Sequence, residues 1–76
     1  MCNYLIDIED SIKNINIDID EMEKNNTAQI ILNYFCGAEN EREFILEARR
    51  AAKARGYECV HEYEDDELLI IVRKVA

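Results

Sequence analysis

The chain has 76 residues, with 17 acidic and nine basic side chains and a formal net charge of −8 at pH 7. A field this negative repels nucleic-acid backbones and anionic lipid headgroups and attracts basic partners. With 49% hydrophobic and 34% charged residues, the sequence predicts a single compact domain, 1–76, that is neither disordered nor membrane-spanning.

The acidic residues are concentrated at the two ends of the sequence. Residues 1–27 hold seven acids and two bases, residues 28–56 hold four and five, and residues 57–76 hold six and two. Near the start, Asp7, Glu9 and Asp10 interrupt the apolar stretch that a signal peptide requires. We therefore expect a cytoplasmic protein with acidic surfaces.

The first third of the chain is open to two interpretations. Its apolar residues recur at spacings of three and four, which favours one face of a helix: Leu5, Ile8, Ile12, Ile15, Ile19 and Met22. Alternation over 15–19 favours instead a strand that could form a hairpin with the next one. The helix is the preferred prediction, and 4–8 could form a short strand before it.

A strand and a second helix follow. Residues 28–35 are rich in Ile, Leu and aromatic side chains and end before Gly37, which predicts a strand. Asn40 and Glu43 have the spacing of a capping box, so a helix is expected to begin there. Gly56 is expected to end it, because glycine readily adopts the left-handed C-cap conformation.

The last 20 residues predict an antiparallel hairpin. Tyr57, Cys59, His61 and Tyr63 share one face of a strand and alternate with Glu58, Val60, Glu62 and Glu64 on the other face. The acidic residues 64–67 predict a tight turn into 68–75. A right-handed parallel crossover is expected for the strand–helix–strand unit before it. The predicted fold is α+β: two helices packed on a small mixed three- or four-stranded sheet, in the order α (or βα)-β-α-β-β.

The final strand is apolar on both of its faces. Leu68, Ile70 and Val72 share one face, while Leu69 and Ile71 share the other. Two short helices normally cover only one face of a small sheet. We expect either the first helix or another molecule, including a second copy in a homodimer, to cover Leu69 and Ile71.

The sequence does not predict a catalytic centre, a metal site or a bound cofactor. His61 is the only histidine, and a half-buried imidazole with satisfied hydrogen bonds is the preferred interpretation. The three cysteines form no Cys-x-x-Cys pair, so we expect free thiols. Cys36 and Cys59 are expected to be buried as small hydrophobic residues, whereas Cys2 is a candidate reactive thiol.

With a leading strand, the order β-α-β-α-β-β resembles that of the TusA-like sulfur carriers, and Cys2 then precedes the first helix as the carrier cysteine does. The resemblance implies a thiol-dependent carrier or redox protein. The Cys-Pro-x-Pro motif of that family is not present, because the chain reads Cys2-Asn3-Tyr4-Leu5 and contains no proline.

The preferred hypothesis is a small acidic protein without enzymatic activity, such as a regulator or inhibitor encoded by a phage or mobile element. Its expected partner is a protein with a basic surface, including a nucleic-acid-binding one, and neither nucleic acid nor membrane is expected to bind directly. The candidate partner-binding residues are Asp18, Asp20, Glu21, Glu23, Glu62, Glu64, Asp65 and Asp66.

Overall fold

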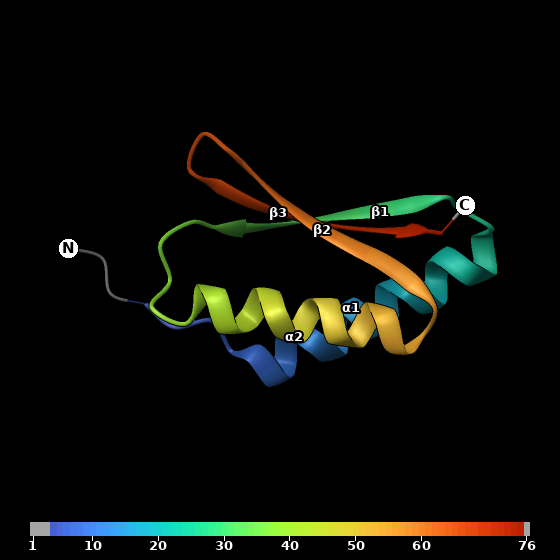
Figure 1. Cartoon of the computed structure of the whole chain (residues 1–76), viewed down its shortest axis with the longest axis horizontal. Helices are drawn as coiled ribbons and strands as arrows, with labels where there is room; N and C mark the ends of the chain where they lie inside the picture. Colours follow the sequence, from blue (N-terminus) through green and yellow to red (C-terminus); the bar gives the residue numbers. More distant parts are fainter. Residues whose placement is uncertain (1–3, 76) are drawn as a thin grey trace.

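The computed structural model describes residues 4–75, which form two helices and three strands (Figure 1). In chain order these are α1 (Ile8–Asn25), β1 (Gln29–Phe35), α2 (Glu41–Ala54), β2 (Tyr57–Glu64) and β3 (Glu67–Lys74). The predicted α+β class is confirmed, as are the order α-β-α-β-β and the C-terminal hairpin.

The sheet has the strand order β1-β3-β2, and both of its pairings are antiparallel. β1 and β2 run in the same direction, but β3 lies between them. The sheet is therefore antiparallel where a mixed sheet was expected. The physical reason is that β3 carries the longest apolar run, so it takes the central position, where both of its edges are paired and its side chains are best covered.

The first third is helical, as preferred. Asp7 caps α1, since its carboxylate accepts a hydrogen bond from the backbone N–H of Asp10 at 3.1 Å. On the predicted face, Ile15, Ile19 and Met22 are buried. Burial of this stripe outweighs the modest helix propensity of isoleucine and aspartate.

The start of the described chain is not a strand. Residues 4–7 are irregular, so the described residues do not show the β-α-β-α-β-β order that resembled the sulfur carriers. The expected capping box of α2 is also wrong. Asn40 makes no side-chain cap; its amide instead accepts from the Ile6 N–H at 2.9 Å and donates to the Ile6 carbonyl at 2.8 Å. The side chain therefore ties the N-terminal segment to α2, which is why it cannot cap. Gly56 follows α2 with φ +85°, as predicted.

Both helices pack on the same face of the sheet (Figure 1). Leu68, Ile70 and Val72 point toward the helices and are completely buried. They meet buried side chains of α1 and α2, among which Phe44 is the largest. The first helix thus does not cover the second face of the sheet, which carries Leu69 and Ile71. We call this second face the open face.

Candidate protein-binding surfaces

The open face of the sheet carries an apolar row that crosses all three strands. The strand register places Ile31 of β1 opposite Ile71 of β3, and Ile71 opposite Val60 of β2. Ile71 is only 7% exposed because its neighbours shield it, whereas Ile31 is 51% exposed. Leu69 lies half-buried on the same face, two residues along β3. Both residues predicted for the interface, Leu69 and Ile71, therefore lie on the open face.

Mostly acidic residues frame this row. Glu58 pairs with Arg73 across the strands at 2.7 Å. On the other side of the row, Glu62 lies opposite Leu69, and Glu64 lies opposite Glu67. The face thus has an apolar centre and a predominantly negative rim, a pattern typical of protein-binding surfaces with a polar border.

Two of the four candidate acids of α1 are engaged inside the molecule. The Arg55 guanidinium donates to the carboxylates of Asp20 and Glu23, the latter at 2.9 Å, and to the Asn16 carbonyl at 2.9 Å. The Tyr57 hydroxyl also donates to Glu23, at 2.6 Å. Asp20 and Glu23 therefore join α1 to the end of α2 and the start of β2, and they are less available to a partner than the sequence suggested.

The other two candidate acids of α1, Asp18 and Glu21, line a hollow of about 300 Å³ beside the start of β1. The second acidic group lies at the opposite end of the molecule, around the β2–β3 turn (Figure 1). There Asp65 adopts φ +55° and, with Asp66, forms the exposed turn that the sequence predicted. The pair Asp18 and Glu21 consequently does not merge with the acids of the β2–β3 turn into one patch.

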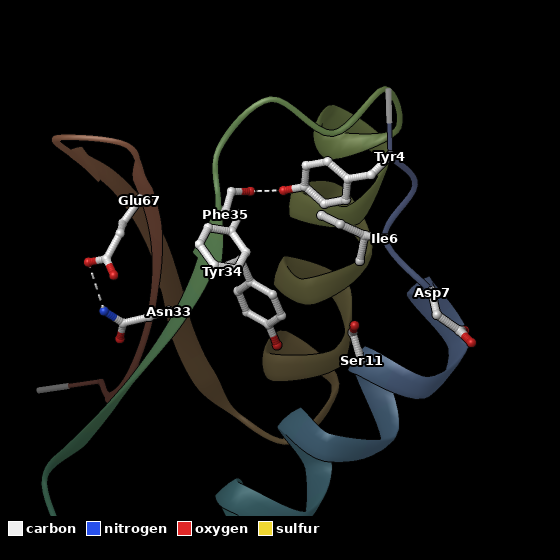
Figure 2. A pocket seen from close by; sticks show the side chains of 8 residues that line it. All are labelled: Tyr4, Ile6, Asp7, Ser11, Asn33, Tyr34, Phe35 and Glu67. Carbon is white, nitrogen blue, oxygen red and sulfur yellow. Dashed lines mark hydrogen bonds between the residues drawn. The ribbon is translucent and has the colours of Figure 1, made fainter. Parts of the chain in front are cut away.

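A second hollow, of about 310 Å³, lies at the other end of β1 (Figure 2). Tyr4, Ile6 and Tyr34 give it an apolar lining, and the Tyr4 hydroxyl donates to the backbone carbonyl of Phe35. Its acidic members are Asp7 and Glu67. We call these two hollows, which lie at the two ends of β1 next to α1 and the segment before it, the β1 groove.

The β1 groove is electrostatically negative. Four carboxylate residues line it, and none of its described lining residues is a lysine or arginine. Burial raises the pKa of the Tyr34 hydroxyl, and the nearby Asp18 carboxylate raises that pKa further. Figure 2 shows this hydroxyl pointing toward Ser11 of α1. A positively charged ligand is therefore favoured over an anion at this site.

The sequence did not single out Ile31, Val60 or the β1 groove. The signal for Ile31 was the alternation within the first strand, but only the register shows that Ile31 and Val60 flank Ile71. The groove joins residues of α1 to residues of β1 and β3. A single sequence does not contain that information, because the groove depends on which edge of the sheet α1 lies beneath.

The side chains whose chemistry would suit a reactive site contact one another on the helix side of the sheet. Arg49 lies 3.1 Å from Nδ1 of His61, which must accept because a guanidinium only donates. The half-buried imidazole predicted from the sequence is thus confirmed. The ring also stacks edge-on against Tyr63, whose hydroxyl donates to Glu41 at 2.8 Å.

The two described cysteines differ. Cys59 packs half-buried against the core, and this burial raises the pKa of its thiol while Arg49 partly offsets the shift. Cys36 is exposed, so the expectation that it would be buried is wrong. It follows the end of β1, where its N–H donates to the Asp66 carbonyl at 2.9 Å and its side chain lies outside the core. Cys2, the candidate reactive thiol, lies outside the described residues.

Within residues 4–75, no cluster of three or more His, Cys, Asp or Glu side chains is arranged to hold a metal ion. Over the same range, no helix has the length and apolar character needed to cross a membrane. The chain matches no family model, and neither a curated protein nor a solved structure shows significant similarity to it.

Proposed function

We propose that this protein is a non-catalytic binding module whose open sheet face receives a basic surface of a partner protein. The observation that carries the proposal is the row Ile31–Ile71–Val60. It lies on a face that no helix of residues 4–75 covers, and it has a mostly acidic rim. This arrangement suits a partner with apolar side chains at its centre and lysines or arginines around them.

The two parts of the face have different roles. Apolar contacts at the centre of an interface supply most of the affinity once water is excluded from them. Charged residues at the rim mainly increase the association rate and select the partner. We therefore expect Val60 and Ile31 to influence dissociation, and Glu62 and Glu64 to influence association and its dependence on salt.

The electrostatic field supports a protein as the partner. Glu62, Glu64 and Glu67 form the acidic rim at one end of the open face, where the Asn33 amide donates to Glu67 at 3.2 Å. A nucleic-acid backbone would be repelled by the net charge of −8. A basic protein surface, including one that otherwise binds nucleic acid, would be attracted.

Affinity capture with matched variants tests the proposal. The tagged protein is used to retain partners from a lysate of its source cells, and the protein eluted by salt is purified and titrated against each variant. Neutralising the rim with Glu62→Gln and Glu64→Gln is expected to slow association at least about fivefold at low salt. Val60→Thr, which keeps the side-chain shape but replaces a methyl group by a hydroxyl, is expected to accelerate dissociation.

The matched control neutralises two exposed acids away from the open face, Glu9→Gln and Glu39→Gln. It has the same net charge as the rim variant, so it corrects for the general field. Equal effects of the rim and control variants, or binding that resists high salt, would show that the open face is not the binding surface.

A further inference from the structure

The outer edge of β1 is an unpaired strand edge within the described residues. At the two ends of the strand, the Lys74 N–H donates to the Ala28 carbonyl at 3.1 Å and the Cys36 N–H donates to the Asp66 carbonyl at 2.9 Å. In an antiparallel ladder the residues that bond to the neighbour alternate along the strand. Even-numbered residues thus bond to β3, and the backbone groups of Ile31 and Asn33 point away from it.

This edge lacks the usual protection against pairing. β1 contains no charged residue, whereas β2, the other edge strand, carries Glu58, Glu62 and Glu64. Charged side chains on an edge discourage the addition of another strand. In a chain with a net charge of −8, an uncharged seven-residue edge is the place where an extended segment can approach most easily.

The two hollows of the β1 groove lie at the two ends of this strand. At one end of the strand Asp18 and Glu21 line it together with Ile31, and at the other end Asp7 lines it together with Phe35. Figure 2 shows the second hollow opening between β1 and the segment that leads into α1. An added strand would therefore have carboxylates beside the half of its side chains that face the helices.

We propose that an extended basic segment of the partner protein adds to the free edge of β1 as a fourth strand. This proposal rests on the proposed function in one respect, which is that the partner protein is positively charged. The backbone groups of Ile31 and Asn33 would supply hydrogen bonds, and Asp18 and Glu21 would select lysine or arginine side chains.

A second copy of this chain is a less suitable occupant. Pairing β1 with its own copy would bring two α1 helices side by side, because α1 lies beneath this strand. In antiparallel pairing, the end of β1 near Asp18 and Glu21 in one copy would then lie beside the end near Asp7 in the other. Like charges at such short distances oppose association, whereas a basic segment meets the same carboxylates favourably.

The geometry also specifies the pattern of the segment. In antiparallel pairing, directly opposed residues point their side chains to the same face. Residues whose N–H groups bond to Ile31 and Asn33 would thus lie on the open face, where apolar side chains extend the row. The alternate residues would point toward Asp18 and Glu21. The expected segment therefore alternates basic and apolar residues.

A capped eight-residue peptide of alternating lysine and valine is the probe. It is titrated into the ¹⁵N-labelled protein, and the largest shifts are expected in residues 29–35. Two modified peptides are compared, one N-methylated on every valine and the other on every lysine. Methylating the valines removes the donors that face β1 and is expected to weaken binding at least about tenfold, while methylating the lysines changes it little.

Equal affinities of the two methylated peptides would overturn strand addition, since only a paired backbone distinguishes them. Binding of an otherwise identical glutamate–valine peptide with the same affinity would overturn the charge selection. Both comparisons leave the protein unchanged, so neither depends on whether a variant folds.

A matched pair of variants tests the edge from the side of the protein. Asn33→Pro removes an N–H that points away from β3, a position where an edge strand tolerates proline. Asn33→Ala removes the same side chain but keeps this N–H. Peptide binding should be lost in the first variant and kept in the second. A wild-type dimer in light scattering that Asn33→Pro converts to a monomer would assign the edge to a second copy and overturn the proposal.

These results separate the two proposals. If the captured partner is sensitive to the Glu62 and Glu64 variants but not to Asn33→Pro, the open face is the binding surface and strand addition is wrong. If the peptide binds the edge while the rim variants have no effect on the partner, the assignment of the open face is wrong.

Discussion

The two faces of the sheet are made by the same three strands but have opposite surroundings. On β3, Leu68, Ile70 and Val72 are completely buried beneath the helices. Among the described residues, Leu69 and Ile71 on the other face are covered only by their neighbours in the sheet. The difference shows that the apolar character of β3 exceeds what its own helices can bury. The excess apolar surface is what makes the open face a candidate binding surface.

The largest expected difference between the faces is in stability. Ile70→Ala and Leu69→Ala each remove three carbon atoms from adjacent positions of β3. Ile70 is completely buried, so its loss should reduce the free energy of unfolding by about 2–5 kcal/mol, since a cavity remains. Leu69 is half-buried on the open face, and its loss should cost about 1 kcal/mol.

Urea denaturation followed by circular dichroism measures both variants, and unchanged m-values would show that the comparison is valid. Similar losses in the two variants would mean that the open face is already covered in solution, most simply by a second copy. Repeating the measurement at several protein concentrations shows whether a second copy is responsible, because the stability of a dimer depends on concentration.

Thiol reactivity sharpens the same comparison. The experiment uses a Cys2→Ser variant, so that Cys36 and Cys59 are the remaining thiols. Cys59 lies half-buried on the helix side, where burial raises the pKa of its thiol. Cys36 is exposed beyond the end of β1. Alkylation by iodoacetamide at pH 8 should be at least about tenfold faster at Cys36, because the thiolate is the reactive form. The two rates should converge in urea, and mass spectrometry of the peptides measures them.

The smallest expected effect concerns the Glu58–Arg73 pair on the open face. The hydrogen bond from Arg73 lowers the pKa of Glu58, and its positive charge lowers it further. A carboxyl whose pKa is lower in the folded state stabilises the fold at high pH, and this contribution is lost as the pH falls through the folded pKa. Arg73→Gln should therefore raise the pKa of Glu58 and flatten the loss of stability below about pH 4.5.

Carboxyl-carbon NMR measures the pKa of Glu58 directly. Arg50→Gln is the control. It changes the net charge by the same amount, but Arg50 pairs with Glu47 on α2. An identical shift of the Glu58 pKa in both variants would show that the general field, and not the hydrogen bond from Arg73, determines it.

Local patterns predicted most of the fold. The three-and-four spacing around Ile15 and Ile19, the alternation after Tyr57 and the glycine at 56 depend on neighbouring residues only, and each led to the correct element. The capping-box prediction was wrong because the Asn40 amide hydrogen-bonds instead to the backbone of Ile6, 34 residues away. A pattern of two residues cannot show such a long-range competitor.

The candidate site was predictable only in part. The two faces of β3 follow from the period of a strand, so Leu69 and Ile71 were assigned to the correct side. The placement of β3 between β1 and β2 depends on tertiary packing, and it determines that Ile31 and Val60 join the apolar row. Likewise, the concentration of acids in residues 1–27 indicated an acidic surface, but Arg55, which pairs with Asp20 and Glu23, comes from a distant part of the sequence.

The bidentate contact between the Asn40 amide and the Ile6 backbone has a consequence for how the chain acquires its structure. It joins residues 34 positions apart, so the segment before α1 can dock only after α2 has begun to form. During synthesis on the ribosome, Ile6 emerges well before Asn40. The wall that this segment contributes beside β1 therefore cannot be completed before Asn40 and the start of α2 are available.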